Sequence, residues 1–170
     1  SLMQYYDGSN WVSIDAPPVV SSVNNANPTE TQIAAGFDIV ITGEGFKSGA
    51  TVKFIGNDGT TYTSPTVTFN SVTQLTARLH ASVSNAKEPY DVKVINPSNL
   101  FALQEDIISV DTAPSWTTSA GNLGTIYDTA TGNHATVAAT DPDGDTITYS
   151  LLSGSLGGLS LGSSTGVISG

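Results

Sequence analysis

The residues best suited to chemistry are the three carboxylates of Asp141-Pro142-Asp143-Gly144-Asp145, which alternate around a turn. Hard cations such as Ca²⁺ bind several oxygen ligands presented by a flexible loop. The spacing is not that of an EF-hand, because glycine stands fourth rather than sixth and Leu152 occupies the place of the final glutamate. Two interpretations stay open: the carboxylates bind calcium, or Asp and Gly build a solvated turn.

Groups that could catalyse a reaction are few and isolated. His80 and His134 are the two imidazoles, and neither accompanies a serine elbow or a second histidine at metal-ligand spacing. No sequence feature marks a pair of glycosidase carboxylates among Glu30, Glu44, Glu88 and Glu105. Cysteine is absent, which excludes a thiol nucleophile, a thiolate metal site and a disulfide. We therefore expect that the chain is not an enzyme.

The glycines at Gly43-Glu44-Gly45 and Gly49 do not form a nucleotide motif. The third glycine of the dinucleotide pattern would fall at Ser48, and the Gly-Lys-Ser/Thr of a phosphate-binding loop is missing. We interpret Gly43-Glu44-Gly45 as a β-turn.

Composition excludes two classes of partner. With 15 acidic and 5 basic residues among 170, the net charge is −10, which repels phosphate backbones and anionic lipid surfaces. Nucleic acid is therefore not an expected partner. No apolar run approaches the roughly 18–20 residues of a membrane span, so we expect no membrane insertion.

Apolar and polar residues alternate repeatedly between Val19 and Val110, and a period of two places the apolar side chains on one face of a strand. The alternating sets are Phe37-Ile39-Ile41, Val52-Phe54, Val67-Phe69, Leu75-Ala77-Leu79 and Tyr90-Val92-Val94. Turn residues such as Asn57-Asp58-Gly59 separate them at spacings typical of a β-sandwich. We interpret the one helix-like stretch, 74–86, as strand plus loop. The predicted fold class is all-β.

Prolines divide the chain. Residues 2–14 predict a β-hairpin turning at Asp7-Gly8-Ser9-Asn10, and the Pro17-Pro18 pair ends it. Val110-Asp111-Thr112-Ala113-Pro114 echoes Ile14-Asp15-Ala16-Pro17 about one immunoglobulin-domain length later. We predict a hairpin segment and linker at 1–16, an immunoglobulin-like domain at 17–110 and a partial module at 111–170, with strands expected at 135–139, 146–152 and 159–168.

The segment from Pro17 to about Val110 resembles the IPT/TIG immunoglobulin-like domain. The resemblance rests on Pro18 to Val23, Asn27-Pro28, Phe37 to Phe46, Gly49 to Phe54 and Pro89 to Asn96. It implies a β-sandwich in which Gly43 and Gly45 bend the backbone and Phe46 closes one end of the core.

The segment from Asp111 to Gly170 resembles the front half of a cadherin-like immunoglobulin module, of the kind found in tandem in bacterial and phage surface proteins. The residues that carry this are Pro114-Ser115-Trp116, Gly121 to Gly124, Ala138 to Asp145, Ile147 to Leu151, and Leu159-Ser160-Leu161 with Ser164 to Gly170. Acidic loops and linkers of cadherin-like modules share calcium at module junctions. The resemblance therefore implies a calcium set of Asp111, Asp141, Asp143 and Asp145.

Together the two resemblances imply tandem immunoglobulin-like β-sandwiches after an N-terminal hairpin. The hairpin, from Tyr5 to Trp11, is similar to short segments of tailed-phage fibre and virion proteins. We expect a structural spacer and display module of a phage appendage or fibre, with a role in host-surface attachment. The alternative is an extracellular bacterial adhesin or surface-filament module that binds carbohydrate or a cell-surface ligand.

The expected location is the virion surface or the cell exterior, and the expected partners are other subunits of the same structure, in a homo-oligomer or tandem assembly. A glycan or host receptor is a further expected partner. Tyr5, Tyr6, Trp11 and Trp116 could stack on a sugar or on a neighbouring subunit, or pack at module junctions.

Overall fold

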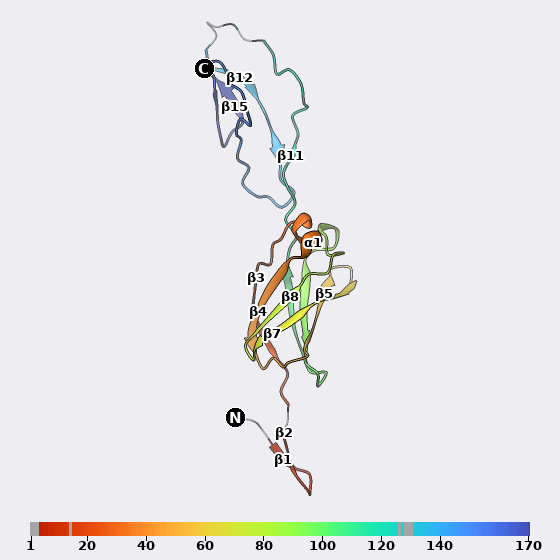
Figure 1. Cartoon of the computed structure of the whole chain (residues 1–170). Coiled ribbons are helices and arrows are strands. Elements are labelled where there is room, and N and C mark those ends of the chain that lie inside the picture. The colour runs from red at the N-terminus through yellow and green to blue at the C-terminus, as the bar shows by residue number, and fades with distance from the viewer. Residues whose placement is uncertain (1–3, 14, 126, 128–130) are drawn as a thin grey trace. The chain divides into compact units, whose positions relative to one another are not determined.

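The computed structural model describes residues 4–13, 15–125, 127 and 131–170, and this part of the chain is all-β, as predicted (Figure 1). Contacts between Cα atoms divide the chain into two compact units, Ser1–Asp111 and Thr112–Gly170. Among the described residues, no helix has the length and apolar character needed to cross a bilayer.

An N-terminal hairpin joins β1 (Gln4–Tyr6) to β2 (Trp11–Ser13) in antiparallel register, which confirms the predicted hairpin. One carboxylate oxygen of Asp7 accepts hydrogen bonds from the amides of Ser9 and Asn10, both at 2.8 Å, and these bonds hold the turn. Leu2, Met3 and Ile14 of the expected hairpin lie outside the described residues.

Two four-stranded antiparallel sheets form a β-sandwich in the first unit. One sheet has the order β3 (Val19–Asn24), β4 (Asp38–Glu44), β8 (Gln74–Arg78), β7 (Val67–Ser71). The other has the order β10 (Phe101–Ile108), β9 (Tyr90–Ile95), β5 (Thr51–Gly56), β6 (Thr61–Thr63). Lettered along the chain, the sheets are ABED and GFCC′, which is an immunoglobulin-like arrangement.

The core lies between these sheets and contains the residues that the alternation predicted. Ile39 and Ile41 of β4, Val52 and Phe54 of β5, Leu75 and Ala77 of β8, and Tyr90, Val92 and Val94 of β9 are all 0% exposed. Phe46 is likewise fully buried, in agreement with its expected place in the core. The exception is Phe69, which is 37% exposed although it stands opposite the buried Leu75, because β7 is an edge strand.

A short helix, α1 (Glu30–Gly36), follows β3 and was not predicted. It begins with a capping box: Thr29 accepts a hydrogen bond from the Gln32 amide at 3.2 Å, and the Gln32 side chain accepts one from the Thr29 amide at 2.9 Å. Its one fully buried residue, Ile33, joins the core. The stretch 74–86 contains β8 and a loop, as predicted, before the 3-10 turn η1 (Asn85–Lys87).

The prediction of a β-turn at Gly43-Glu44-Gly45 was wrong. Gly43 and Glu44 belong to β4, opposite Val20 and Val19, and the turn lies later, where the Ala50 amide bonds to the Lys47 carbonyl at 3.1 Å. Gly43 is required for a different reason: a Cβ there would overlap the Val19 carbonyl oxygen and the Phe46 ring. The glycine allows β3 to approach β4 closely.

The second unit contains small sheets rather than a closed sandwich. One pairs β11 (Ser115–Trp116) with β13 (Ala139–Thr140), and the other has the order β12 (Asn133–Thr136), β15 (Val167–Ser169), β14 (Ser160–Leu161). The buried hydrophobic residues of the described chain all lie between Val23 and Val110. The described part of the second unit therefore lacks a buried core.

The strand expected at 146–152 is not formed. The Tyr149 amide bonds to the Ser163 carbonyl at 2.7 Å, but no ladder continues on either side, and Leu152 is 100% exposed. Alternation alone does not make a strand when a pairing neighbour is missing.

The chain enters and leaves the sandwich at opposite ends. It enters at Val19, beside Glu44, and this end also holds Asn96, whose side chain donates to the Gly45 carbonyl at 2.8 Å. It leaves beside the other end of β3, where the amides of Ser109 and Asp111 donate to the carbonyls of Ala26 and Pro28 at 3.0 and 2.9 Å. A parallel bridge between Thr29 and Asp111 completes this contact.

Candidate functional site

The acidic turn 141–145 is organised by its own first carboxylate. One Asp141 oxygen accepts hydrogen bonds from the amides of Asp143 at 2.9 Å and Asp145 at 3.3 Å. The Gly144 amide bonds to the Asp141 carbonyl at 3.3 Å, and Gly144 has φ of 80°. These bonds are those of an aspartate-nucleated turn, and they favour the turn interpretation of the motif.

Asp143 and Asp111 of the implied calcium set have contacts within their own units. An Asp143 oxygen accepts a hydrogen bond from the Thr112 amide at 2.7 Å, whereas the structure ties Asp111 to Pro28 and Thr29 in the first unit. Across the residues that the structure describes, no group of three or more His, Asp or Glu side chains could hold a metal ion. Calcium binding by Asp111, Asp141, Asp143 and Asp145 stays a prediction.

A surface groove of about 270 Å³ lies in the second unit, beside Trp116. The described residues of its lining are uncharged: Trp116, Thr118, Ser119, Ala120, Gly121, Leu123 and Val137. Trp116 is 65% exposed and rests against the Tyr149 ring, with 5.9 Å between ring centroids and 49° between ring planes. An indole held this way presents an apolar surface next to hydroxyl groups.

The aromatic residues of the hairpin are also exposed: Tyr5 is 52% and Tyr6 is 56% accessible to solvent. The side chain of Trp11, the fourth aromatic residue named as a stacking candidate, lies outside what the structure describes.

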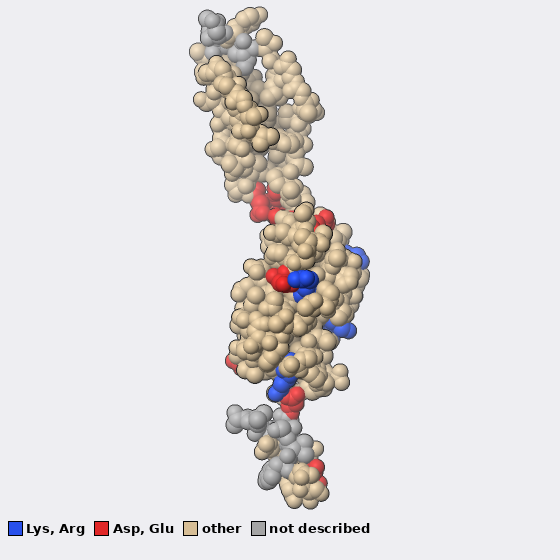
Figure 2. Space-filling model, in the orientation of Figure 1, with Lys and Arg blue, Asp and Glu red and all other residues tan. Residues whose placement is uncertain are grey.

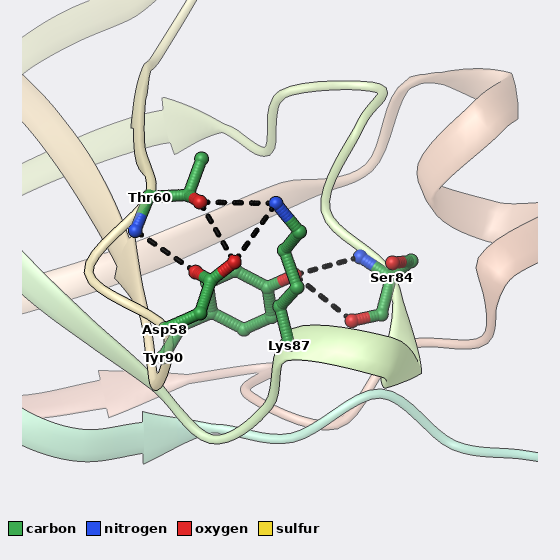
Figure 3. A network of polar contacts seen from close by, with 5 residues as sticks. All are labelled: Asp58, Thr60, Ser84, Lys87 and Tyr90. Atoms are coloured by element: carbon green, nitrogen blue, oxygen red, sulfur yellow. Dashed lines mark hydrogen bonds and ion pairs between the residues drawn. The ribbon is translucent and has the colours of Figure 1, made fainter.

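A polar network joins the β5–β6 turn to the loop before β9 (Figure 3). Thr60 donates from its amide and its hydroxyl to the two oxygens of Asp58, at 2.9 and 2.8 Å. The Lys87 ammonium lies 3.1 Å from Asp58 and donates to the Thr60 hydroxyl at 3.0 Å. Behind it, the Tyr90 hydroxyl donates to the Ser84 carbonyl at 2.9 Å and accepts from the Ser84 amide at 3.0 Å.

The electrostatics of this network follow from its hydrogen bonds. The amide and hydroxyl of Thr60, with Lys87, hold the pKa of Asp58 down at about 2. Hydrogen bonds to Tyr62 and then Asp58 raise the pKa of Lys87, whereas burial raises the pKa of the Tyr90 phenol. All five residues of the network bond to another protein group in it, and these contacts are those of a structural clamp.

The histidines and glutamates considered above as catalytic candidates are dispersed over the fold. His80 accepts a hydrogen bond from the Ser82 amide at 3.1 Å and stacks on Tyr62, with ring centroids 5.3 Å apart. His134 lies in β12, and its Nε2 is buried with no hydrogen-bond partner within the described chain. Glu30 and Glu88 accept hydrogen bonds from the amides of Asn85 and Val110, and these bonds fasten loops.

Sequence reasoning did not find the clamp of Asp58, Thr60 and Lys87. The turn Asn57-Asp58-Gly59 was identified, but nothing local indicates that Lys87, 27 residues after Thr60, returns to it. Charged side chains are otherwise sparse on the visible surface (Figure 2).

A scan against models of known protein families finds none that matches this chain, and a search of curated proteins finds no match either.

Proposed function

We propose that this chain is a structural spacer and display module of an extracellular or virion appendage. The observation that carries the proposal is the placement of entry and exit at opposite ends of the sandwich. A domain connected in this way separates its neighbours by the length of its strands, which is about 20 Å for six residues at about 3.3 Å each. The IPT/TIG and cadherin-like resemblances support the same role.

The contact at the exit suits a module that transmits tension. Residues 26–29 run parallel to residues 109–111, and two amide hydrogen bonds and a bridge join them. Force that pulls the entry and the exit apart slides these segments along each other and loads both bonds together. Unfolding then requires several bonds to break at once rather than one after another.

Single-molecule force spectroscopy on the full chain tests this function. We expect one cooperative event for the sandwich, releasing roughly 300 Å as its ~90 residues extend. Ser109→Pro removes the amide that bonds to Ala26 and should lower the unfolding force, whereas Ser109→Ala keeps the amide and should not. Equal forces for Ser109→Pro and wild type would contradict this mechanical role.

The expected location can be tested directly. Antibodies against the chain should label the outside of intact virions or cells of the source, and labelling only after lysis would exclude surface display.

A second function, carbohydrate binding by an adhesin module, is favoured by the Trp116 groove. The groove combines an exposed indole with the hydroxyls of Thr118 and Ser119, and none of its lining residues that the structure describes is charged. This lining fits a neutral sugar whose C–H face stacks on the ring. Binding of the chain on a neutral-glycan array, lost in Trp116→Ala and kept in Leu123→Ala, would support it. An array without signal would exclude binding of the neutral glycans tested and would leave the spacer role as the proposed function.

A further inference from the structure

The outward surface of the β10–β9–β5–β6 sheet combines charged side chains with exposed apolar ones. Strand alternation places three residues of each central strand on this side, opposite the buried set. We call this surface the outer face; it consists of Thr51, Lys53 and Ile55 of β5, Asp91, Lys93 and Ile95 of β9, and Phe101, Leu103 and Glu105 of β10. Phe101 is 51% and Leu103 42% exposed.

Two lysines face each other at the centre of the outer face. Lys53 and Lys93 are direct partners in the β5–β9 register, an arrangement of like charges that destabilises an isolated sheet. Lys93 rests 3.9 Å from the centroid of the Phe101 ring. Each of the other three basic residues lies within 4 Å of a carboxylate: Lys47 of Asp15, Arg78 of Asp38 and Lys87 of Asp58.

Carboxylates occupy the next row of the same face. Asp91 precedes Lys93 by two residues in β9 and stands opposite Ile55 of β5. Glu105, beside the irregularity in β10, lines the same surface depression as Asp91. One Asp91 oxygen accepts a hydrogen bond from the Asp106 amide at 2.9 Å, which holds the carboxylate in place. A basic row and an acidic row therefore lie about 7 Å apart along the strands.

We propose that the outer face binds the outer face of a second copy of this chain. The two copies are related by a two-fold axis that lies midway between their sheets. The axis runs perpendicular to the strands and passes between the basic and the acidic row, so the strands of the two copies point in opposite directions. It places Lys93 of each copy over Asp91 of the other, and Lys53 lies one strand away from this pair. Lys93, which is repelled by Lys53 within its own sheet, then faces an opposite charge across the interface, and Phe101 and Leu103 add apolar contact.

The size of the face sets the strength of this association. Four strands about 4.8 Å apart and five residues of about 3.3 Å each cover roughly 300 Å², well below the ~800 Å² per partner of a stable complex. The dimer is therefore weak and concentration-dependent. In an appendage, where neighbouring copies are held close together, such pairing would align them side by side. The inference does not depend on the spacer function, because its test measures association alone.

Sedimentation equilibrium of the full chain from about 10 µM to about 1 mM tests the proposal. We expect a reversible dimer whose dissociation constant rises about tenfold or more in Lys93→Glu and also in Asp91→Lys. Mixing these two variants should restore association as a heterodimer, because each supplies the charge that the other lacks. Circular dichroism verifies that each variant is folded, and if Asp91→Lys is not, Asp91→Asn, which removes the same charge, replaces it in the single-variant measurement.

Lys47→Glu is the matched control, since it makes the same change of charge outside the outer face and should leave the dissociation constant unchanged. A wild-type chain that stays monomeric to 1 mM would overturn the proposal. So would equal weakening by Lys93→Glu and Lys47→Glu, or a mixture of the complementary variants that does not associate.

Discussion

Replacing Tyr90 with phenylalanine removes one oxygen atom from the fully buried start of β9 and leaves the ring unchanged. That oxygen makes two hydrogen bonds to one residue, donating to the Ser84 carbonyl and accepting from the Ser84 amide. Because the ring stays, no large cavity forms, and the change isolates the two bonds that fix the loop before β9.

The magnitude follows from those bonds. Each contributes about 0.5–1.5 kcal/mol net, and the partly exposed Ser84 can recover some hydration, so Tyr90→Phe should lower the free energy of unfolding by about 2 kcal/mol. For a domain of this size the melting temperature then falls by about 10 °C.

Urea titration, monitored by far-UV circular dichroism, measures this change in unfolding free energy. Tryptophan fluorescence is a poor probe of the sandwich because both tryptophans lie outside it. Tyr62→Phe is the control: Tyr62 is half-buried, and its hydroxyl contacts the partly exposed Lys87, so its loss should cost less than about 1 kcal/mol. Equal effects of the two variants would refute the assignment of the Ser84 bonds as the stabilising contact.

Three other outcomes are expected. Gly43→Ala should lower unfolding free energy by about 1–3 kcal/mol in the same titration, because its methyl group forces β3 away from β4. The pKa of Asp58 is about 2 in the fold against 3.8 ordinarily, so its stabilising contribution is complete above pH 4 and disappears as pH falls toward 2. Asp58→Asn should flatten the stability curve in that window. The turn interpretation of 141–145 predicts no change in melting temperature on adding millimolar calcium; a rise that Asp143→Asn abolishes would instead establish an ion site.

The strands of the sandwich were predictable because their inward residues are apolar and most of the neighbouring residues are polar. Val92 and Val94, separated by Lys93, carry this pattern, and packing against a second sheet reinforces it. Helix α1 was missed because its seven residues contain only one buried apolar side chain and thus no helical stripe. The signal that could have found it is Thr29 followed by Gln32, the two ends of a capping box.

The features assigned to function depend on contacts between distant residues. Lys53 and Lys93 meet only through the β5–β9 register, which local alternation leaves undetermined. The acidic turn was visible in the sequence because the amides that bond to the Asp141 carboxylate belong to residues two and four positions later. Dependence on a distant partner also explains why residues 146–152 form no strand: their sequence alternates, but no neighbouring strand pairs with them.

The parallel contact between residues 26–29 and 109–111 also constrains how the protein is made. Its two halves are about 80 residues apart, so the contact closes a very long loop and contributes to slow, non-local folding. During synthesis the first sheet can assemble once β3 to β8 have been made. Residues 26–29, however, cannot form their contact with residues 109–111 until Asp111 leaves the ribosome. Ile108 and Val110, which complete the core, also emerge only then, and an incompletely covered core of this kind favours aggregation of the nascent chain.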